Sequence, residues 1–185
     1  MRHSNLAHIV QTDLYRLGNS ETITLADDTA IDTVEALFAA IYTNDFYKLS
    51  TGFYPFVFTY SGECVAHGYD SAHVGRTLAE IVADLGIEGS DENLNAQFTG
   101  AAEKGGAWVG YPWKNERSHA LKYKYAYILK ATAGSTDYYV GVGFQDATLQ
   151  EAPADAGGGA PTGSGAFGTA ATYGLLMFAG ALSSM

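Results

Sequence analysis

The residues best suited to bind a small acid lie on predicted strands. A site for a small carboxylate requires one or two cationic or hydrogen-bond donor groups inside an aromatic, partly dry cavity. Residues 122–127 are rich in lysine and tyrosine, and because successive strand residues face opposite sides, Lys122 and Lys124 share one side. Other predicted strands supply further donors and aromatic rings: His67, Trp108 and Tyr111.

Other groups of reactive residues give weaker indications. His67, Asp70 and His73 could be metal ligands, but their spacing fits no established metal motif and they would lie in a loop. Cys64 and His67 could form a thiol and its base, but residues three apart on one strand point to opposite faces. The chain has no Gly-x-Ser-x-Gly elbow, and residues 141–143 lack the third glycine and the following helix of a dinucleotide loop. We therefore predict neither enzymatic activity nor a metal ion or cofactor.

The composition limits the fold and the partners. The chain has 185 residues, of which 47% are hydrophobic and 16% charged, so it is long enough for one domain with a substantial core. Thirteen tyrosines and nine phenylalanines favour a sheet-rich domain. A formal net charge of −10 makes nucleic acid an unsuitable partner. The single cysteine, Cys64, allows no intramolecular disulfide bond.

Apolar residues at helical spacing predict helices at 30–48, 78–85 and 93–104. For the first helix, Asp27 or Asp28 is the expected N-cap and Gly52 marks the end. Residues 1–29 show only a weak amphipathic pattern, and we interpret them as an N-terminal extension.

Runs of β-branched and aromatic residues predict five strands, near 54–60, 63–67, 107–113, 121–131 and 138–144. Short turns at 61–62 and 133–137 predict hairpins, and sequential strands joined in this way form antiparallel sheets. The predicted fold class is α+β, with a five-stranded antiparallel sheet and helices on one face.

In order and spacing, several segments resemble the Cache superfamily, and within it the single Cache type 2 sensor domains of bacterial chemoreceptors and histidine kinases, which are similar in shape to PAS domains. The resembling segments are 54–58, 61–62, 65–67, 74–78, 101–109, 111–113, 122–125 and 139–144. Two features depart from the family pattern. Gly68 follows the histidine where the family usually has proline, and the N-terminal helix is short.

The resemblance implies a PAS-like ligand-binding domain over residues 30–146, with the amphipathic helix packed on the sheet. It places seven residues in or near a pocket: Tyr54, Phe56, His67, Trp108, Tyr111, Lys122 and Tyr125. Arg76, in a loop, is a further candidate. Each has an alternative role, as a core aromatic residue, an exposed strand lysine or a histidine bonded to a loop carbonyl.

The implied function is a sensor module for signal reception, with a short carboxylate as the expected ligand. The alternative is a surface-displayed structural or adhesion protein that uses the fold without a ligand.

The two ends of the chain bear on localisation. Residues 1–13 are too polar for a signal peptide, so either the protein is cytoplasmic or the N-terminus is incomplete. Residues 147–168 have a Gly/Ala/Pro-rich linker composition, and the weakly hydrophobic tail 169–185 follows the order of a glycolipid anchor signal. We expect an extracytoplasmic or cell-surface domain, attached to a membrane through this tail, with the cytoplasm and a disordered tail as alternatives. A homodimer is a further expectation.

Overall fold

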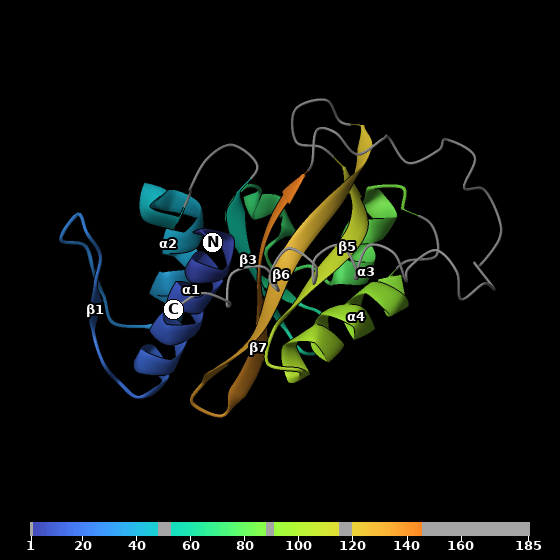
Figure 1. Ribbon diagram of the computed structural model, residues 1–185. Coiled ribbons are helices and arrows are strands. Elements are labelled where there is room, and N and C mark those ends of the chain that lie inside the picture. Colours follow the sequence, from blue (N-terminus) through green and yellow to red (C-terminus); the bar gives the residue numbers. More distant parts are fainter. Residues whose placement is uncertain (1, 48–52, 88–90, 115–119, 146–185) are drawn as a thin grey trace, which may run out of the picture. The chain divides into compact units, whose positions relative to one another are not determined.

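Five strands form one antiparallel sheet in the order β4-β3-β7-β6-β5 (Figure 1). The strands are β3 (Tyr54–Thr59), β4 (Cys64–His67), β5 (Ala107–Lys114), β6 (Leu121–Ala133) and β7 (Thr136–Gln145). The structure is a computed structural model that describes residues 2–47, 53–87, 91–114 and 120–145. The α+β class and all five predicted strands are confirmed. The β6–β7 turn is shorter than predicted, since β7 begins at Thr136.

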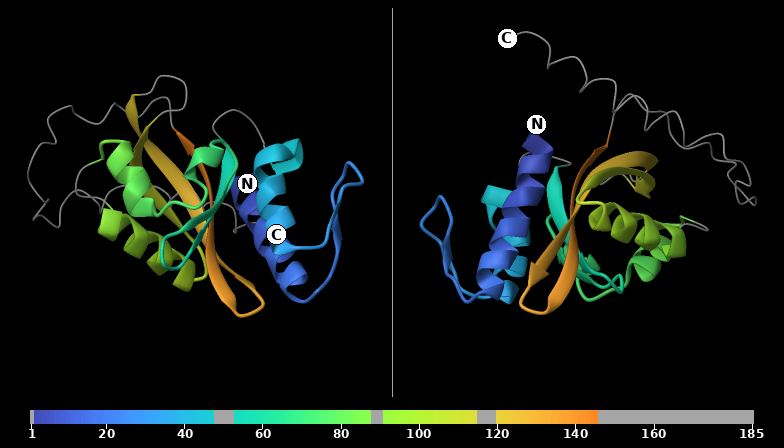
Figure 2. Two further views of the ribbon diagram at one scale, coloured as in Figure 1. Left: turned by 180° about the vertical axis from the view of Figure 1, so that it is seen from behind. Right: turned by 60° about the horizontal axis from the view of Figure 1, so that its bottom comes forward.

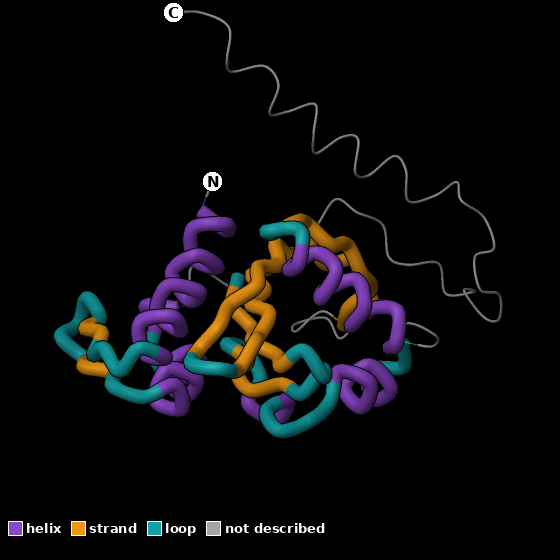
Figure 3. Tube along the Cα trace, turned by 90° about the horizontal axis from the view of Figure 1, so that it is seen from below, coloured by secondary structure: helices purple, strands orange, loops and turns teal. Residues whose placement is uncertain are grey.

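Helices cover both faces of this sheet (Figures 2 and 3). Helices α1 (Arg2–Gly18) and α2 (Val34–Thr43) pack on one face, and α3 (Leu78–Asp84) and α4 (Asp91–Glu103) pack on the other. The expectation of helices on one face is therefore wrong. The two layers arise because α1 and α2, which precede the five strands, pack on the face opposite to α3 and α4, which lie between β4 and β5 in the chain.

Helix α1 belongs to the core. Leu6, Val10, Leu14 and Leu17 are buried at helical spacing and pack in the cluster that includes residues of β6 and β7. Polar residues between them weaken the pattern in the sequence. The segment interpreted as an extension therefore contributes a buried face to the sheet. It continues into a small hairpin of β1 (Ile23–Thr24) and β2 (Ala30–Ile31).

Helix α2 begins later than predicted. Thr33 is its N-cap, and the Thr33 hydroxyl accepts a hydrogen bond from the Ala36 backbone N–H at 3.1 Å. The prediction of Asp27 or Asp28 is wrong, because the Asp27 carboxylate instead accepts bonds from Thr29 and Asn44. The short 3-10 helix η1 (Asp45–Tyr47) follows. The expected end at Gly52 lies outside the described residues.

The helices on the other face match their predictions closely. The N-cap of α3 is Thr77, which forms a reciprocal capping box with Glu80. The short 3-10 helix η2 (Ser71–His73) lies between β4 and α3.

Strand β4 contains a bulge that changes which side its residues face. Val57 pairs with Ala66, but the next β3 residue, Phe58, pairs with Cys64, so Val65 has no partner of its own. Cys64 pairs with Phe58, and His67 pairs with Phe56. The side chains of Cys64 and His67 therefore lie on the same face of the sheet as those of Phe56 and Phe58.

No described helix is both long and apolar enough to cross a membrane. The predicted linker 147–168 and tail 169–185 lie outside the described residues, so the anchor signal stays a prediction.

Candidate functional site

A pocket lies on the sheet face that α3 and α4 cover. It contains about 240 Å³ of unfilled space, including open solvent at its mouth. Its lining residues come from four strands and two helices: Phe56, Phe58, His67, Leu78, Phe98, Tyr111, Trp113 and Lys124. Lys124 and His67 are only 1% and 3% exposed, so a cation and an imidazole lie among aromatic walls.

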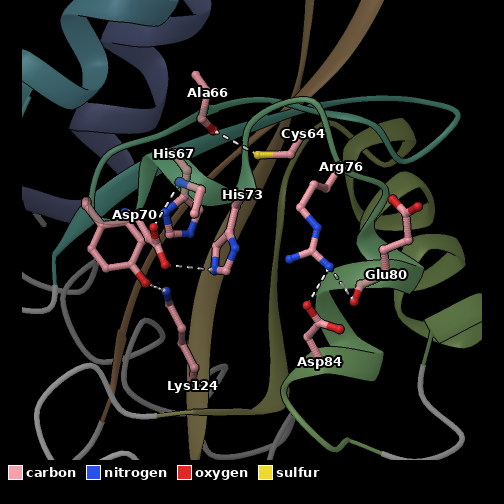
Figure 4. A network of polar contacts seen from close by, with 11 residues as sticks. Cys64, Ala66, His67, Asp70, His73, Arg76, Glu80, Asp84 and Lys124 are labelled. Atoms are coloured by element: carbon pink, nitrogen blue, oxygen red, sulfur yellow. Dashed lines mark hydrogen bonds and ion pairs between the residues drawn. The ribbon is translucent and has the colours of Figure 1, made fainter.

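Lys124 lines the pocket, where aromatic side chains contact its ammonium group. Figure 4 shows Lys124 with the hydrogen bond that its Nζ makes. Its Nζ donates a hydrogen bond to the Tyr54 hydroxyl at 2.6 Å and lies 3.9 Å from the centroid of the same ring. The Phe56 and Trp113 ring centroids are each 5.7 Å from Nζ. These cation–π contacts compensate part of the free energy needed to bury the charge.

Two glycines of β7 make room for this arrangement. A Cβ at Gly141 would lie 2.1 Å from the Phe56 ring, and a Cβ at Gly143 would lie 3.0 Å from Lys124 Cε. Strand β7 is central in the sheet, so both side chains cross over its bare backbone. The glycines at 141 and 143 therefore leave room for two of the side chains that line the pocket, Phe56 and Lys124.

His67 is neutral in this environment. Burial, then the charge of Lys124 and the neighbouring His73, holds the pKa of His67 well below its usual value. Its Nδ1 accepts a hydrogen bond from the Asp70 backbone N–H at 2.9 Å. The neutral ring therefore carries its hydrogen on Nε2, as a donor.

The three candidate metal ligands do not converge as a metal site requires. Asp70 Oδ1 accepts a bond from the Ala72 backbone, and Asp70 Oδ2 is 3.8 Å from His73 Nε2. In the part of the chain that the structure describes, no three His, Cys, Asp or Glu side chains group around a common point.

Cys64 shares a face with His67, so our geometric reason for separating them is wrong; the bulge at Val65 reverses it. The thiol instead donates a weak hydrogen bond to the Ala66 carbonyl, with sulfur and oxygen 3.7 Å apart. Burial raises the pKa of Cys64 to about 12, so the reactive thiolate is scarce near neutral pH.

The structure brings together four of the seven predicted site residues. Phe56, His67 and Tyr111 line the pocket, and Tyr54 contacts Lys124. Trp108 and Tyr125 do not meet them, because their places in β5 and β6 face the other side of the sheet.

The rings of both residues confirm that placement. Trp108 packs on Tyr127 and Phe144, and Tyr125 packs on Phe144. The alternation along each strand thus puts them outside this pocket.

Lys122 and Arg76 complete the placement of the candidate residues. Lys122 shares a face with Lys124 but pairs with Trp113 nearer the strand end and does not line the pocket. Arg76 turns to α3, where it contacts Asp84 at 2.7 Å (Figure 4).

Sequence reasoning left four lining residues out of the site: Phe58, Leu78, Phe98 and Trp113. It expected at least one of Lys122 and Lys124 to line the cavity but named Lys122 in the predicted set. Strand alternation supplies a signal for two of the four. Phe58 follows Phe56, and Trp113 follows Tyr111, each at a spacing of two.

Comparisons with known proteins agree with this architecture. Residues 29–149 match the Cache domain family. No curated protein matches the chain. Among solved structures, a methyl-accepting chemotaxis protein from Vibrio parahaemolyticus RIMD 2210633 has 15% sequence identity and a TM-score of 0.53, over 78% of this chain and 86% of that one.

Two further structures are similar. A periplasmic sensor domain of a chemotaxis protein has 18% identity and a TM-score of 0.53, over 78% of this chain and 94% of that one. A structure described as the basis for carboxylic acid recognition by a Cache chemosensory domain has 14% identity and a TM-score of 0.51, over 78% and 86%. At these identities the likeness shows the fold. The family match covers most of the chain and confirms the predicted resemblance: this chain belongs to the Cache domain family, a family of ligand-sensing modules.

Proposed function

We propose that this Cache domain senses a small organic anion, a short carboxylate, in the pocket on the α3/α4 face. The observation that carries the proposal is the position of Lys124, a cation 1% exposed that lines a pocket. An anion beside Nζ would form a charge-assisted hydrogen bond in a setting of low dielectric.

The walls favour a ligand that is small and otherwise apolar. The unfilled space of about 240 Å³ includes open solvent, so the enclosed part of the pocket is smaller still. Phe56, Phe98 and Trp113 offer apolar contacts, and the neutral His67 offers an N–H to a second carboxylate oxygen. A ligand amine would instead be repelled by Lys124.

The proposed site consists of the predicted Tyr54, Phe56, His67 and Tyr111 together with Lys124. It omits Trp108 and Tyr125, because they face the other side of the sheet. It also omits Lys122, because this residue pairs with Trp113 nearer the strand end and does not line the pocket. A similar solved structure described as recognising carboxylic acids supports the ligand class.

We also propose that the domain works outside the cytoplasm. One of the similar structures is a periplasmic sensor domain, which supports this location. Attachment through the tail 169–185 and a homodimer remain predictions for the full protein.

Calorimetric titration of the whole chain tests the ligand proposal. Acetate and propionate should bind, whereas propionamide and propylamine should not. Lys124→Met should weaken acetate by about 1.5–3 kcal/mol, the contribution of a hydrogen bond to a charged group. That corresponds to roughly 10- to 150-fold in Kd.

Lys122→Met is the matched control, since it removes a lysine two residues away on the same strand face. It should leave Kd unchanged. Equal binding of the amide, or full acetate affinity in Lys124→Met, would reject the proposed site. A folded protein that binds no carboxylate would favour the structural or adhesion alternative.

A further inference from the structure

We propose that His73 couples anion binding in this pocket to the uptake of a proton, so that the anion binds more tightly as the pH falls. The inference rests on the proposed function of the pocket. It adds a residue that does not line the cavity, together with a form of regulation.

His73 lies directly behind the pocket wall. Its ring is 4.8 Å from that of His67, edge to face, and 6.2 Å from that of Trp113, and both of these rings line the pocket. The side chain is 13% exposed, and its Nδ1 is buried without a hydrogen-bond partner in the structure described. A buried polar atom of this kind has unused capacity for a proton or a donor.

Asp70 makes His73, rather than His67, the place for the proton (Figure 4). The Asp70 backbone N–H already donates a hydrogen bond to His67 Nδ1. A proton on Nδ1 would turn that nitrogen into a second donor facing the first, and the hydrogen bond would be lost. His73 faces no such donor, and its Nε2 lies 3.8 Å from the Asp70 carboxylate. A protonated His73 would therefore gain an ion pair, whereas a protonated His67 would lose a hydrogen bond.

The charges around His73 come from several elements. Asp70 and Asp84 favour its protonation, whereas Lys124 and Arg76 oppose it.

Two neutral groups complete these surroundings. His67 is uncharged, and the Tyr54 ring packs against His67 with the two ring centroids 4.9 Å apart. In the protein without a ligand, burial is the main cause that holds the pKa of His73 below its usual value of 6.5.

An anion at Lys124 would offset one of the two opposing charges. The pKa of His73 would then rise towards the ambient pH, and a proton would bind with the anion. Linkage is reciprocal, so protons must strengthen anion binding by the same factor. The sign follows: Kd decreases as pH falls through the window between the free and the liganded pKa of His73.

Acetate titrations of the whole chain between about pH 7.5 and about pH 5.5 test the coupling, because carboxylates stay ionised there. If the anion raises the pKa by about one unit, Kd should fall by up to about tenfold. Calorimetry in buffers of different ionisation enthalpy should show net proton uptake. In His73→Gln the Kd should become independent of pH. His8→Gln, an exposed histidine of α1, should keep the dependence.

Histidine NMR titration of the wild-type protein gives a readout that needs no variant to fold. Saturating acetate should move the His73 midpoint upward. A wild-type Kd that is constant over this range, or an unchanged dependence in His73→Gln, would overturn the coupling while leaving the proposed function intact. If acetate and propionate fail to bind at every pH, the proposed function falls, and the coupling with it.

Discussion

On the α1/α2 face, the sheet buries aliphatic side chains such as Val57, Leu129 and Val140, whereas on the α3/α4 face it buries aromatic rings together with Lys124 and His67. The same strands supply both faces, by alternation. Apolar burial stabilises at about 25 cal/mol per Å², while a buried charge costs free energy unless partners compensate it. Both faces therefore contribute a buried core, and the α3/α4 face in addition buries a cation and an imidazole, which is where we place the proposed recognition site.

The largest expected effect is on the α1/α2 face. Leu14→Ala should lower the free energy of unfolding by about 2–5 kcal/mol, because Leu14 is fully buried between α1 and the sheet. Urea denaturation measures it, and acetate affinity of the folded fraction should not change.

Tyr15→Ala is the control on the same helix, since Tyr15 is 63% exposed. Its effect should stay within about 0.5 kcal/mol. If Leu14→Ala weakened acetate binding with little loss of stability, the α1/α2 face would take part in binding, and the proposed difference between the two faces would be wrong.

An intermediate effect is expected at Gly141, where the Phe56 ring packs against the bare backbone of β7. Gly141→Ala places a methyl group 2.1 Å from the Phe56 ring, so the ring must move. Overpacking of this kind costs about 1–3 kcal/mol of stability, and acetate affinity should fall with it. Thermal denaturation and titration measure both quantities on one sample.

Gly100→Ala in α4 is the matched substitution, because nothing lies within 4 Å of its added methyl group. It should stabilise the protein by about 0.5–1 kcal/mol, the usual gain from alanine in a helix. A Gly141→Ala protein with unchanged stability and affinity would show that β7 does not shape the pocket.

The smallest expected effect distinguishes the two tryptophans of β5. Trp108 is 48% exposed and faces away from the pocket, whereas Trp113 is 6% exposed and lines it. Trp108→Ala should change the Kd for acetate by less than about twofold, and Trp113→Ala should weaken it at least about tenfold. If Trp108→Ala weakened acetate binding more than Trp113→Ala, the binding site would lie on the other face of the sheet.

Much of the fold could be predicted from the sequence, because each β-strand carries a period of two and short turns separate them. Helix α1 was harder to assign, since Ile9 is partly exposed and polar residues interrupt its apolar stripe. Its burial depends on a sheet that forms from residues far along the chain.

The candidate site could be predicted in part. Trp108 lies three residues from Tyr111, and Lys122 three from Tyr125, so alternation alone separates each pair. The family resemblance outweighed that rule in our assignment. The choice of Lys124 over Lys122 depends on depth: Lys124 lies opposite Tyr111, while Lys122 lies opposite Trp113, nearer the end of β6. Depth is a tertiary property that strand periodicity does not encode.

The unpaired Val65 has a consequence for sequence alignment and for grafting. In a relative whose β4 has the same length but pairs in regular register from Cys64 onward, the histidine in the same aligned column would point at α1 and α2. A histidine in this alignment column is therefore not enough to assign an imidazole to the pocket of another family member. Anyone who builds this pocket into a different sheet must copy the extra residue as well as the side chains it redirects.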